Sequence, residues 1–394
     1  MEYLEKRKIH FLHIVKDEKF FDGVINAFES EERFDNRSIL VVNSAEYKFI
    51  RIKQTAKVEL LWSWEMLRDC LESSNYDAIF FHSLSASQYK YFQYIPKDKI
   101  VIWWSWGFDI YNESHGMSPL IQMDPYKPLT LKLYNERRKN ILCCVKDMFT
   151  YINGLIDKKR YYRLRNSAIS RIDFFQPVIP LEYQIMKGVD GFRAKEFYYP
   201  RCFMSYQVDT KCEKRGDGAI LIGNSATYTN NHVDIWDSIR NFVPHDRDVI
   251  IPVNYGFQCY TKKIATRIQS KNHNIRFIFD FMPRDEYFQL LDDCSYAVFG
   301  VIRQQAMGNI NYCLSHGMKV FLYRDSMVYR FLKDNGYVVF AIEEIDESSF
   351  TRPLTQDQLR QNSIAFEREK EYINKTREEA FEMIIKKCNQ LEAD

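Results

Sequence analysis

Apolar runs of strand length alternate with helical stretches twice along the chain, and this alternation constrains the fold more than any other feature. In the first half the runs are "IHFLHIV", "SILVVN", "DAIFFH" and "KIVIWWSWG", separated by stretches such as "WSWEMLRDCLESS". After Gly218 strands are expected again at "AILIGN", "DVIIPV", "IRFIFDF", "YAVFGV", "KVFLY" and "YVVFAI". Because such alternation builds βαβ units, we expect two doubly wound α/β domains with largely parallel sheets.

The size of the chain agrees with two separate cores. It has 394 residues, of which 46% are hydrophobic, enough for two ordinary domains. Glycine, proline and charge gather between residues 188 and 218, where we place the boundary. We therefore expect an N-terminal Rossmann-like domain over residues 1–205, a second one over 216–365, and a charged amphipathic helix over 366–394 that packs back on the first domain.

Charge and cysteine usage exclude several classes of protein. Lys and Arg number 55 against 53 Asp and Glu, a net charge of +2, so nothing favours nucleic acid as a partner. The nine cysteines are scattered without a C-x-x-C pair, which favours free thiols in a reducing cytoplasm. No stretch reaches the roughly 20 apolar residues of a membrane span, and the first residues do not resemble a signal peptide. We expect a soluble or peripheral protein.

The stretch "LIGNSATYTNNH" places small polar residues between a strand and a helix start. Ligands of open α/β sheets bind at the carboxyl ends of strands, near the unpaired N–H groups of helix N-termini. Gly223, Asn224, Ser225 and Asn230 are therefore candidates to bind an anion such as a phosphate. The alternative is plain capping of the helix. Neither a G-x-G-x-x-G fingerprint nor a P-loop is present.

Two further strand ends are polar in the same way. "YAVFGVIRQQAMGN" carries Arg303, whose guanidinium can fork onto a phosphate, and the amides of Gln304, Gln305 and Asn309. "VIIPVNYG" carries Tyr255, which could stack on a base or a sugar. A surface arginine with capping amides is the alternative. Three polar strand ends in one unit indicate a single nucleotide-like ligand on the second domain.

In the first domain two strands end near groups that can accept a proton. His82 closes "DAIFFH", and Asp109 follows "WWSWGF". Either could act as a general base toward a bound hydroxyl. The alternatives are a satisfied histidine at a strand end and a helix cap.

The segment from Lys127 to Arg165 is basic and helical in pattern, with eleven Lys or Arg and three Asp or Glu. Basic helices with apolar faces suit an anionic membrane surface. Lys132, Arg137, Arg138 and Lys139 are the residues we expect to face the membrane or a lipid-linked acceptor. A solvated helix face that packs on the sheet is the alternative.

Taken together, "WSWGFDIY", "LIGNSATYTNNH", "VIIPVNYG", "DEYFQLLDDC" and "IRQQAMGNINYCLSHG" resemble the bacterial glycosyltransferase family 56, whose members transfer 4-acetamido-4,6-dideoxy-D-galactose (Fuc4NAc) to lipid-linked intermediates of enterobacterial common antigen. In the second domain the matching positions are Gly223, Asn224, Ser225, Asn230, His232, Arg303, Gln304, Gln305 and Gly308. In the first domain they are His82, Trp106, Gly107, Asp109 and Tyr111.

The resemblance implies a GT-B glycosyltransferase with two Rossmann-like domains that face a cleft. It also implies a dTDP-sugar donor on the second domain, a polyprenyl-diphosphate-linked acceptor, and a peripheral position on the cytoplasmic face of the bacterial inner membrane. The enzyme would be a hexosyltransferase of surface polysaccharide assembly. Since no D-x-D follows a strand, we expect a reaction that needs no metal, in which helix N-terminal amides and Arg303 stabilise the leaving diphosphate.

Two other functions are compatible with the residues. A nucleotide-sugar epimerase can share the architecture, because a fold does not determine its chemistry. A non-catalytic nucleotide-binding protein is the second alternative.

Overall fold

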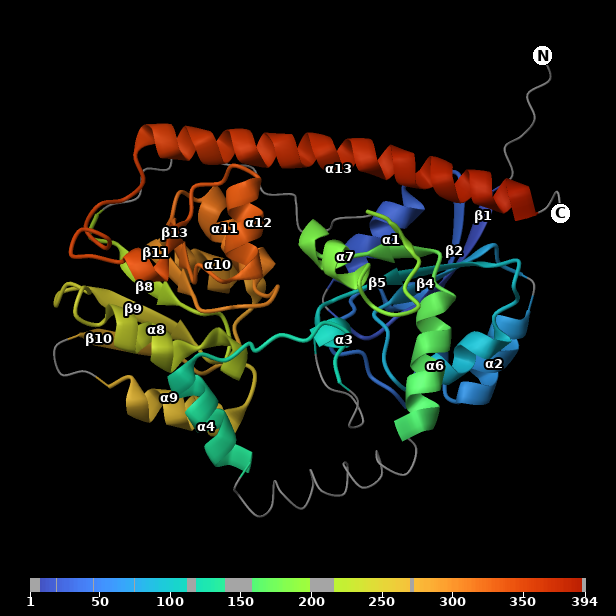
Figure 1. Ribbon diagram of the computed structural model, residues 1–394, viewed down its shortest axis with the longest axis horizontal. Coiled ribbons are helices and arrows are strands. Elements are labelled where there is room, and N and C mark those ends of the chain that lie inside the picture. The colour runs from blue at the N-terminus through green and yellow to red at the C-terminus, as the bar shows by residue number, and fades with distance from the viewer. Residues whose placement is uncertain are drawn as a thin grey trace. The chain divides into compact units, whose positions relative to one another are not determined.

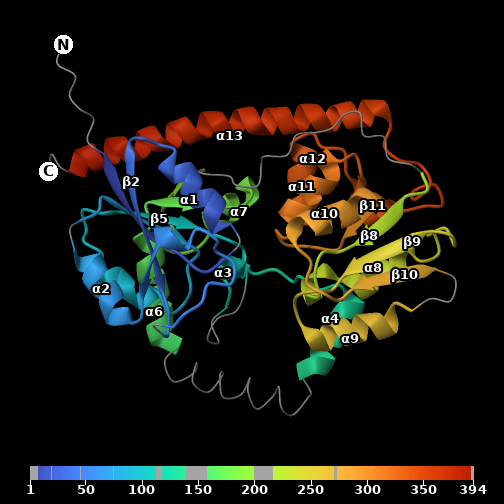
Figure 2. The same ribbon diagram turned by 180° about the vertical axis from the view of Figure 1, so that it is seen from behind.

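A computed structural model describes residues 8–18, 20–44, 46–73, 75–111, 118–138, 158–198, 216–269 and 273–391. The chain divides into two compact units, shown in Figures 1 and 2. Among the described residues, the first unit takes 8–122, 158–198 and 371–391, and the second takes 123–138 and 216–370.

The first unit is built on a seven-stranded sheet with the order β3-β2-β1-β4-β5-β6-β7. Its strands are β1 (Ile9–Ile14), β2 (Phe34–Val41), β3 (Val58–Leu61), β4 (Ala78–His82), β5 (Ile100–Trp104), β6 (Phe174–Gln176) and β7 (Lys195–Glu196). Its helices are α1 (Phe21–Glu29), α2 (Trp64–Glu72), α3 (Phe108–Tyr111), α6 (Lys158–Ser170) and α7 (Pro180–Met186), with 3-10 turns η1 (Thr55–Lys57) and η2 (Tyr89–Tyr94). All strand pairs are parallel. Strands β4 and β5 are buried along their whole length, as expected when helices cover both faces of a sheet.

The second unit has a six-stranded parallel sheet with the order β10-β9-β8-β11-β12-β13. Its strands are β8 (Ala219–Ile222), β9 (Asp248–Pro252), β10 (Asn274–Ile278), β11 (Cys294–Phe299), β12 (Lys319–Leu322) and β13 (Phe340–Ala341). Its helices are α4 (Pro128–Arg138), α8 (His232–Ile239), α9 (Gln258–Arg267), α10 (Arg284–Asp292), α11 (Met307–Ser315) and α12 (Met327–Asp334), with 3-10 turns η3 (Tyr228–Asn230) and η4 (Ile342–Glu344). Figures 1 and 2 show α10, α11 and α12 on one face of this sheet and α4, α8 and α9 on the other. The doubly wound parallel architecture predicted from the sequence is confirmed.

Helix α4 belongs to the second unit, whereas the sequence placed residues 1–205 in one domain. Its N-terminus is held by α8, because the carboxylate of Asp234 accepts the backbone N–H groups of Leu129 and Thr130, each at 2.8 Å. A carboxylate at this position satisfies free N–H groups and complements the helix dipole. The hydrogen bonds that assign α4 to the second unit thus span more than 100 residues of sequence.

The C-terminal helix α13 (Gln356–Leu391) is longer than expected and begins ten residues before position 366. Thr355 and Gln358 form a reciprocal capping box, with the Gln358 N–H donating to Thr355 Oγ1 and the Thr355 N–H donating to Gln358 Oε1. Residues of α13 up to 370 group with the second unit and those from 371 with the first, where Phe381 and Ile384 join the core.

Two smaller differences from the predicted elements concern strands. Strands β3 and β7 were not expected, and the run "YVVFAI" forms only the two-residue strand β13. In the described part of the chain, no helix combines the length and the apolar character needed to cross a membrane.

Candidate functional site

Three loops that follow β8, β9 and β11 meet at the carboxyl edge of the second sheet. The backbone N–H of Ala226 donates to Tyr255 O at 2.7 Å, and that of Phe257 donates to Ala226 O at 2.8 Å. Thr229 Oγ1 donates to Gln305 Oε1 at 2.7 Å, which joins the β8 and β11 loops. The three polar strand ends identified in the sequence therefore form one connected surface.

Gly223 ends β8 with a positive φ of 68°. A Cβ atom there would lie 2.6 Å from His232 Nε2 and 3.3 Å from Asn230 Oδ1. Any side chain would therefore clash with the first turn of α8 and strain the backbone. The glycine lets the strand end pass directly beside these two polar side chains.

Three polar atoms around Gly223 are buried without a hydrogen-bond partner among the described residues: Asn224 Oδ1, Asn230 Oδ1 and His232 Nε2. Buried polar atoms are nearly always paired, so a cluster of unpaired ones is typical of a site that a ligand completes. Burial lowers the pKa of His232 to about 3, so the ring is neutral at physiological pH.

Asn230 organises the loop before α8. Its Nδ2 donates to Ser225 O at 2.9 Å, Ser225 Oγ at 3.0 Å and Thr227 Oγ1 at 2.9 Å. Asn224 and Ser225 are themselves buried. Of the predicted loop residues, Asn230 thus has mainly a positioning role, whereas the Asn224 oxygen is still available to a ligand.

Asn231 directly follows the candidate Asn230 and connects several segments of the second unit. It adopts the left-handed conformation with φ 52°. Its Nδ2 donates to Gly300 O at 2.7 Å and Pro125 O at 2.9 Å, and its Oδ1 accepts the N–H of Lys127 at 2.9 Å. One buried side chain therefore joins the β8 loop, the β11 loop and the segment that leads into α4.

The β11 loop carries Arg303, Gln304 and Gln305. Arg303 is half-buried and Gln304 is buried, and the Arg303 guanidinium donates to Gln304 O at 3.3 Å. The loop ends at Ala306, which adopts φ 62°, and α11 follows without an acidic residue in its first turn. A half-buried guanidinium beside a helix start without acidic residues suits an anionic ligand.

Gly308 and Asn309 lie in the first turn of α11. A Cβ on Gly308 would meet no atom within 4 Å, so packing inside the unit does not require glycine there. Asn309 is half-buried. Both residues closely follow the loop that carries Arg303.

Tyr255 extends the site along the β9 loop. Its hydroxyl accepts a hydrogen bond from Asn224 Nδ2 at 3.1 Å, while 47% of the residue stays exposed. The neighbouring Phe257 is 43% exposed, and Phe279 after β10 is 55% exposed. These open aromatic rings can stack on a planar ligand. Phe257 and Phe279 were not predicted as site residues, although Phe257 directly follows "VIIPVNYG" and Phe279 lies within "IRFIFDF".

In the first unit His82 lies inside the core. Its Nε2 lies 3.0 Å from His13 Nδ1, and His13 Nε2 lies 3.0 Å from Asn36 Oδ1. Burial lowers the pKa of both histidines, that of His13 to about 4. A buried ring engaged with a second histidine favours the structural alternative for His82.

Asp109 lies in the first turn of α3 and connects the segments that follow β4 and β5. Its carboxylate accepts Trp103 Nε1–H at 2.9 Å, the Trp106 N–H at 2.9 Å and the Leu84 N–H at 3.1 Å. Burial raises the pKa of Asp109, against the lowering effect of these hydrogen bonds. A raised pKa suits a general base, and the three donors show that the carboxylate also has a structural role.

Glu182 is a buried carboxylate that the sequence analysis missed. It accepts the Tyr111 hydroxyl at 2.8 Å and the N–H groups of Val178 and Ile179 at 2.8 and 3.2 Å. Burial raises its pKa to about 7, and the charge of Asp109 acts in the same direction. The pattern "IPLE", with proline at the first position of α7, is the capping signal that could have revealed it.

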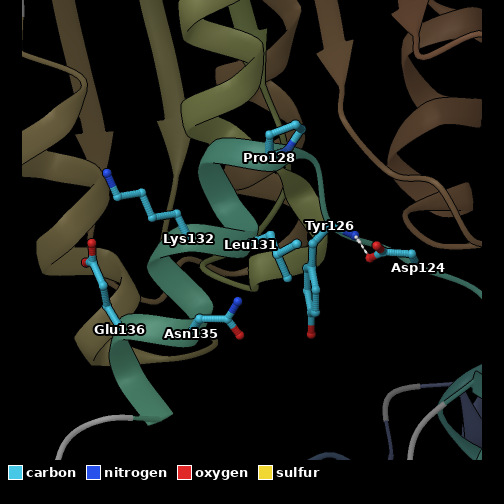
Figure 3. A pocket seen from close by; sticks show the side chains of 7 residues that line it. All are labelled: Asp124, Tyr126, Pro128, Leu131, Lys132, Asn135 and Glu136. Carbon is cyan, nitrogen blue, oxygen red and sulfur yellow. Dashed lines mark hydrogen bonds between the residues drawn. The ribbon is translucent and has the colours of Figure 1, made fainter.

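The basic segment is described only in part. Figure 3 shows a pocket over α4 and the turn before it, and its lining consists of Asp124, Tyr126, Pro128, Leu131, Lys132, Asn135 and Glu136. Lys132 is exposed there. Arg137 and Arg138 end α4, with only their backbone described, and Lys139 lies outside the described residues.

The fold of the chain is similar to that of several solved structures. HepE from Anabaena, solved with UDP and glucose, has 11% identity and a TM-score of 0.53, with 98% of both chains covered. The UDP-forming α,α-trehalose-phosphate synthase of Burkholderia xenovorans has 10% identity and a TM-score of 0.57, with 96% of this chain and 99% of that chain covered. The O-GlcNAc transferase of Thermobaculum terrenum has 9% identity and a TM-score of 0.54, with 98% and 69% covered.

At these identities the similarity establishes the fold, which is that of the GT-B glycosyltransferases. Residues 146–381, more than half of the chain, match the family described as 4-alpha-L-fucosyltransferase, glycosyl transferase group 56. The chain belongs to this family and is a glycosyltransferase. The predicted family and fold class are thereby confirmed, and the epimerase and the non-catalytic alternatives are set aside.

Proposed function

We propose that the enzyme transfers a Fuc4NAc-like sugar from a dTDP-sugar to a hydroxyl of a polyprenyl-diphosphate-linked saccharide in surface polysaccharide assembly. The unpaired buried cluster of Asn224, Asn230 and His232 beside Gly223 carries the proposal. It lies in a loop that is hydrogen-bonded to the loop of Arg303, so polar atoms and a cation occur together at one sheet edge.

In this proposal the nucleotide lies along the strand-end loops. The diphosphate accepts hydrogen bonds from Arg303 and from the N–H groups of the β8 loop, and the base stacks on Tyr255. Gln304, Gln305, Gly308 and Asn309 border the donor from the β11 side. Charge that develops on the leaving phosphate is stabilised by these fixed groups, and we expect no metal to be required.

The acceptor hydroxyl attacks the anomeric carbon of the donor. The bond from that carbon to the β-phosphate oxygen breaks, dTDP leaves, and Asp109 takes the proton of the hydroxyl. Asp109 is preferred over His82 because the ring of His82 is engaged in the core. The enzyme works at the cytoplasmic face of the inner membrane, with the basic segment around Lys132, Arg137, Arg138 and Lys139 facing anionic lipid.

The donor site is tested by titrating dTDP into the purified enzyme. Loss of a charge-assisted hydrogen bond to phosphate costs about 1.5–3 kcal/mol, so Arg303→Ala should weaken dTDP binding about 10- to 100-fold. Arg240→Ala is the matched control, since Arg240 is an exposed arginine of the same unit whose ion-pair partner is Asp237. Equal affinities of the two variants would eliminate Arg303 as the phosphate ligand.

The base is tested with a dTDP-sugar and a lipid-linked acceptor, by measuring the glycosylated lipid and the released dTDP. Asp109→Asn should lower transfer at least about a hundredfold while dTDP affinity is retained. Because Asp109 also holds Leu84 and Trp106, thermal unfolding of the variant must accompany the assay. A folded variant with full activity contradicts the assignment.

A further inference from the structure

An exposed basic loop in the first unit has no role in the proposed chemistry. This edge loop, residues 46–54, follows β2 and contains Lys48, Arg51 and Lys53 together with one acidic residue, Glu46. All three cations are exposed, and within the described residues none of them has an ion-pair partner. The loop therefore presents three exposed cations without an ion pair in the described part of the chain, while the nearby carboxylates of Asp17 and Asp22 accept hydrogen bonds from its backbone.

The tip of the edge loop is apolar. Ile50 is 84% exposed and stands between Lys48 and Arg51. Its neighbours point inward, since Ile52 is buried and Phe49 packs against the core of the first unit. An isoleucine held outward between cations exposes apolar surface that water solvates poorly.

The conformation of the loop is fixed by two carboxylates beneath it. Asp17 accepts the N–H groups of Ile50, Arg51 and Ile52 at 2.6, 2.9 and 2.9 Å. Asp22 accepts those of Lys53 and Gln54 at 3.1 and 3.0 Å. A loop that is already ordered loses little conformational entropy when it binds a partner.

A second exposed apolar side chain lies at the same sheet edge. Trp62 directly follows β3, the strand that pairs with β2 in parallel, and is 54% exposed. Trp62 follows the carboxyl end of β3, and the edge loop is hydrogen-bonded to Asp17, which follows the carboxyl end of β1, so both lie toward the carboxyl edge of the parallel first sheet. Tryptophan is enriched at membrane–water interfaces, where its ring lies at headgroup level.

We propose that the edge loop, together with Trp62, binds an anionic membrane surface. Cations attract the lipid phosphates, while Ile50 and Trp62 enter the headgroup region. A folded protein partner would need about 800 Å² of matched surface, whereas a bilayer requires only a few apolar side chains surrounded by cations. The inference rests on the proposed function in one respect, since a lipid-linked acceptor explains why the enzyme would bind a membrane. The vesicle assay itself contains neither donor nor acceptor.

The test is sedimentation of the full-length protein with vesicles of phosphatidylcholine containing about one-third phosphatidylglycerol. The variant K48Q/R51Q/K53Q should bind about a hundredfold more weakly at low salt, at roughly fivefold per cation. Ile50→Ser should bind about tenfold more weakly. Wild-type binding should fall with added salt and on pure phosphatidylcholine.

The matched control is R360Q/K370Q/K375Q with Ile364→Ser on α13, which removes the same number of exposed cations and one exposed isoleucine. The proposal is overturned if the loop variants bind vesicles as the control does, or if the wild-type protein does not bind anionic vesicles. All variants should retain dTDP affinity. If the vesicle test fails while dTDP still binds, only the membrane proposal is contradicted. If vesicle binding is intact but no sugar is transferred to a short-chain acceptor, only the transferase proposal is contradicted.

Discussion

Replacement of Asn231 tests how the loops after β8 and β11 and the segment before α4 are held together. The side chain is fully buried and makes three hydrogen bonds, to Gly300, Pro125 and Lys127. At about 0.5–1.5 kcal/mol for each hydrogen bond, Asn231→Gly should cost about 2–4 kcal/mol. Asn231→Ala should cost about 1 kcal/mol more, because φ is 52° at this position and a β-carbon disfavours the left-handed region.

Hydrogen exchange of individual amides measures the effect where it arises. The N–H of Lys127 donates to Asn231, and those of Leu129 and Thr130 donate to Asp234. Local opening made easier by about 2–4 kcal/mol should lower the protection of these amides about 30- to 1,000-fold. Asn335→Gly is the control, since Asn335 donates one hydrogen bond to Phe331 on α12 of the same unit.

Two results would refute the reasoning. Unchanged protection at Lys127, Leu129 and Thr130 in both variants would show that Asn231 does not hold the segment before α4. An alanine variant no less protected than the glycine variant would show that the left-handed backbone carries no strain.

Three further variants test other parts of the structure. Gly223→Ala should lower the melting temperature and weaken dTDP binding at least about tenfold, because the new Cβ would lie 2.6 Å from His232 Nε2; wild-type behaviour contradicts the close approach. The pKa of Glu182 is raised from 4.5 in the unfolded chain to about 7 in the folded protein. The free energy of unfolding should therefore fall by about 3 kcal/mol as the pH rises from below 4.5 through 7. In Glu182→Gln, urea titrations should show a weaker dependence of this free energy on pH. The lowered pKa values of His82 and His13 predict the opposite trend, in which the free energy of unfolding decreases as the pH falls below 6.5. The decrease should be shallower in His82→Gln. An identical decrease in the variant would show that His82 does not cause it.

The meeting of three polar strand ends at one candidate site could be predicted because its signals are local in sequence. Gly223, Arg303 and Tyr255 each directly follow an apolar run, and a parallel sheet brings the carboxyl ends of neighbouring strands to one edge. The connection of the three loops by Thr229, Gln305 and the backbone follows from that topology.

The roles of individual side chains could not be predicted in the same way. His82 and Asp109 look alike in sequence, each a titratable group after a buried strand. Burial and partners separate them, since His82 pairs with His13 inside the core whereas Asp109 has a raised pKa at a loop. Glu182 remained hidden because its partner Tyr111 lies 71 residues away.

The sequence by itself determined the two α/β units, the largely parallel character of their sheets and the polar strand ends, because periodicity and turn residues act over a few neighbouring positions. Only the tertiary structure decided that α4 belongs to the second unit, that Asn231 joins two loops to it, and that Ile50 is exposed in a loop whose backbone donates hydrogen bonds to Asp17. These features depend on hydrogen bonds and burial between distant residues. These contacts form only when the chain folds, so no local sequence pattern predicts them.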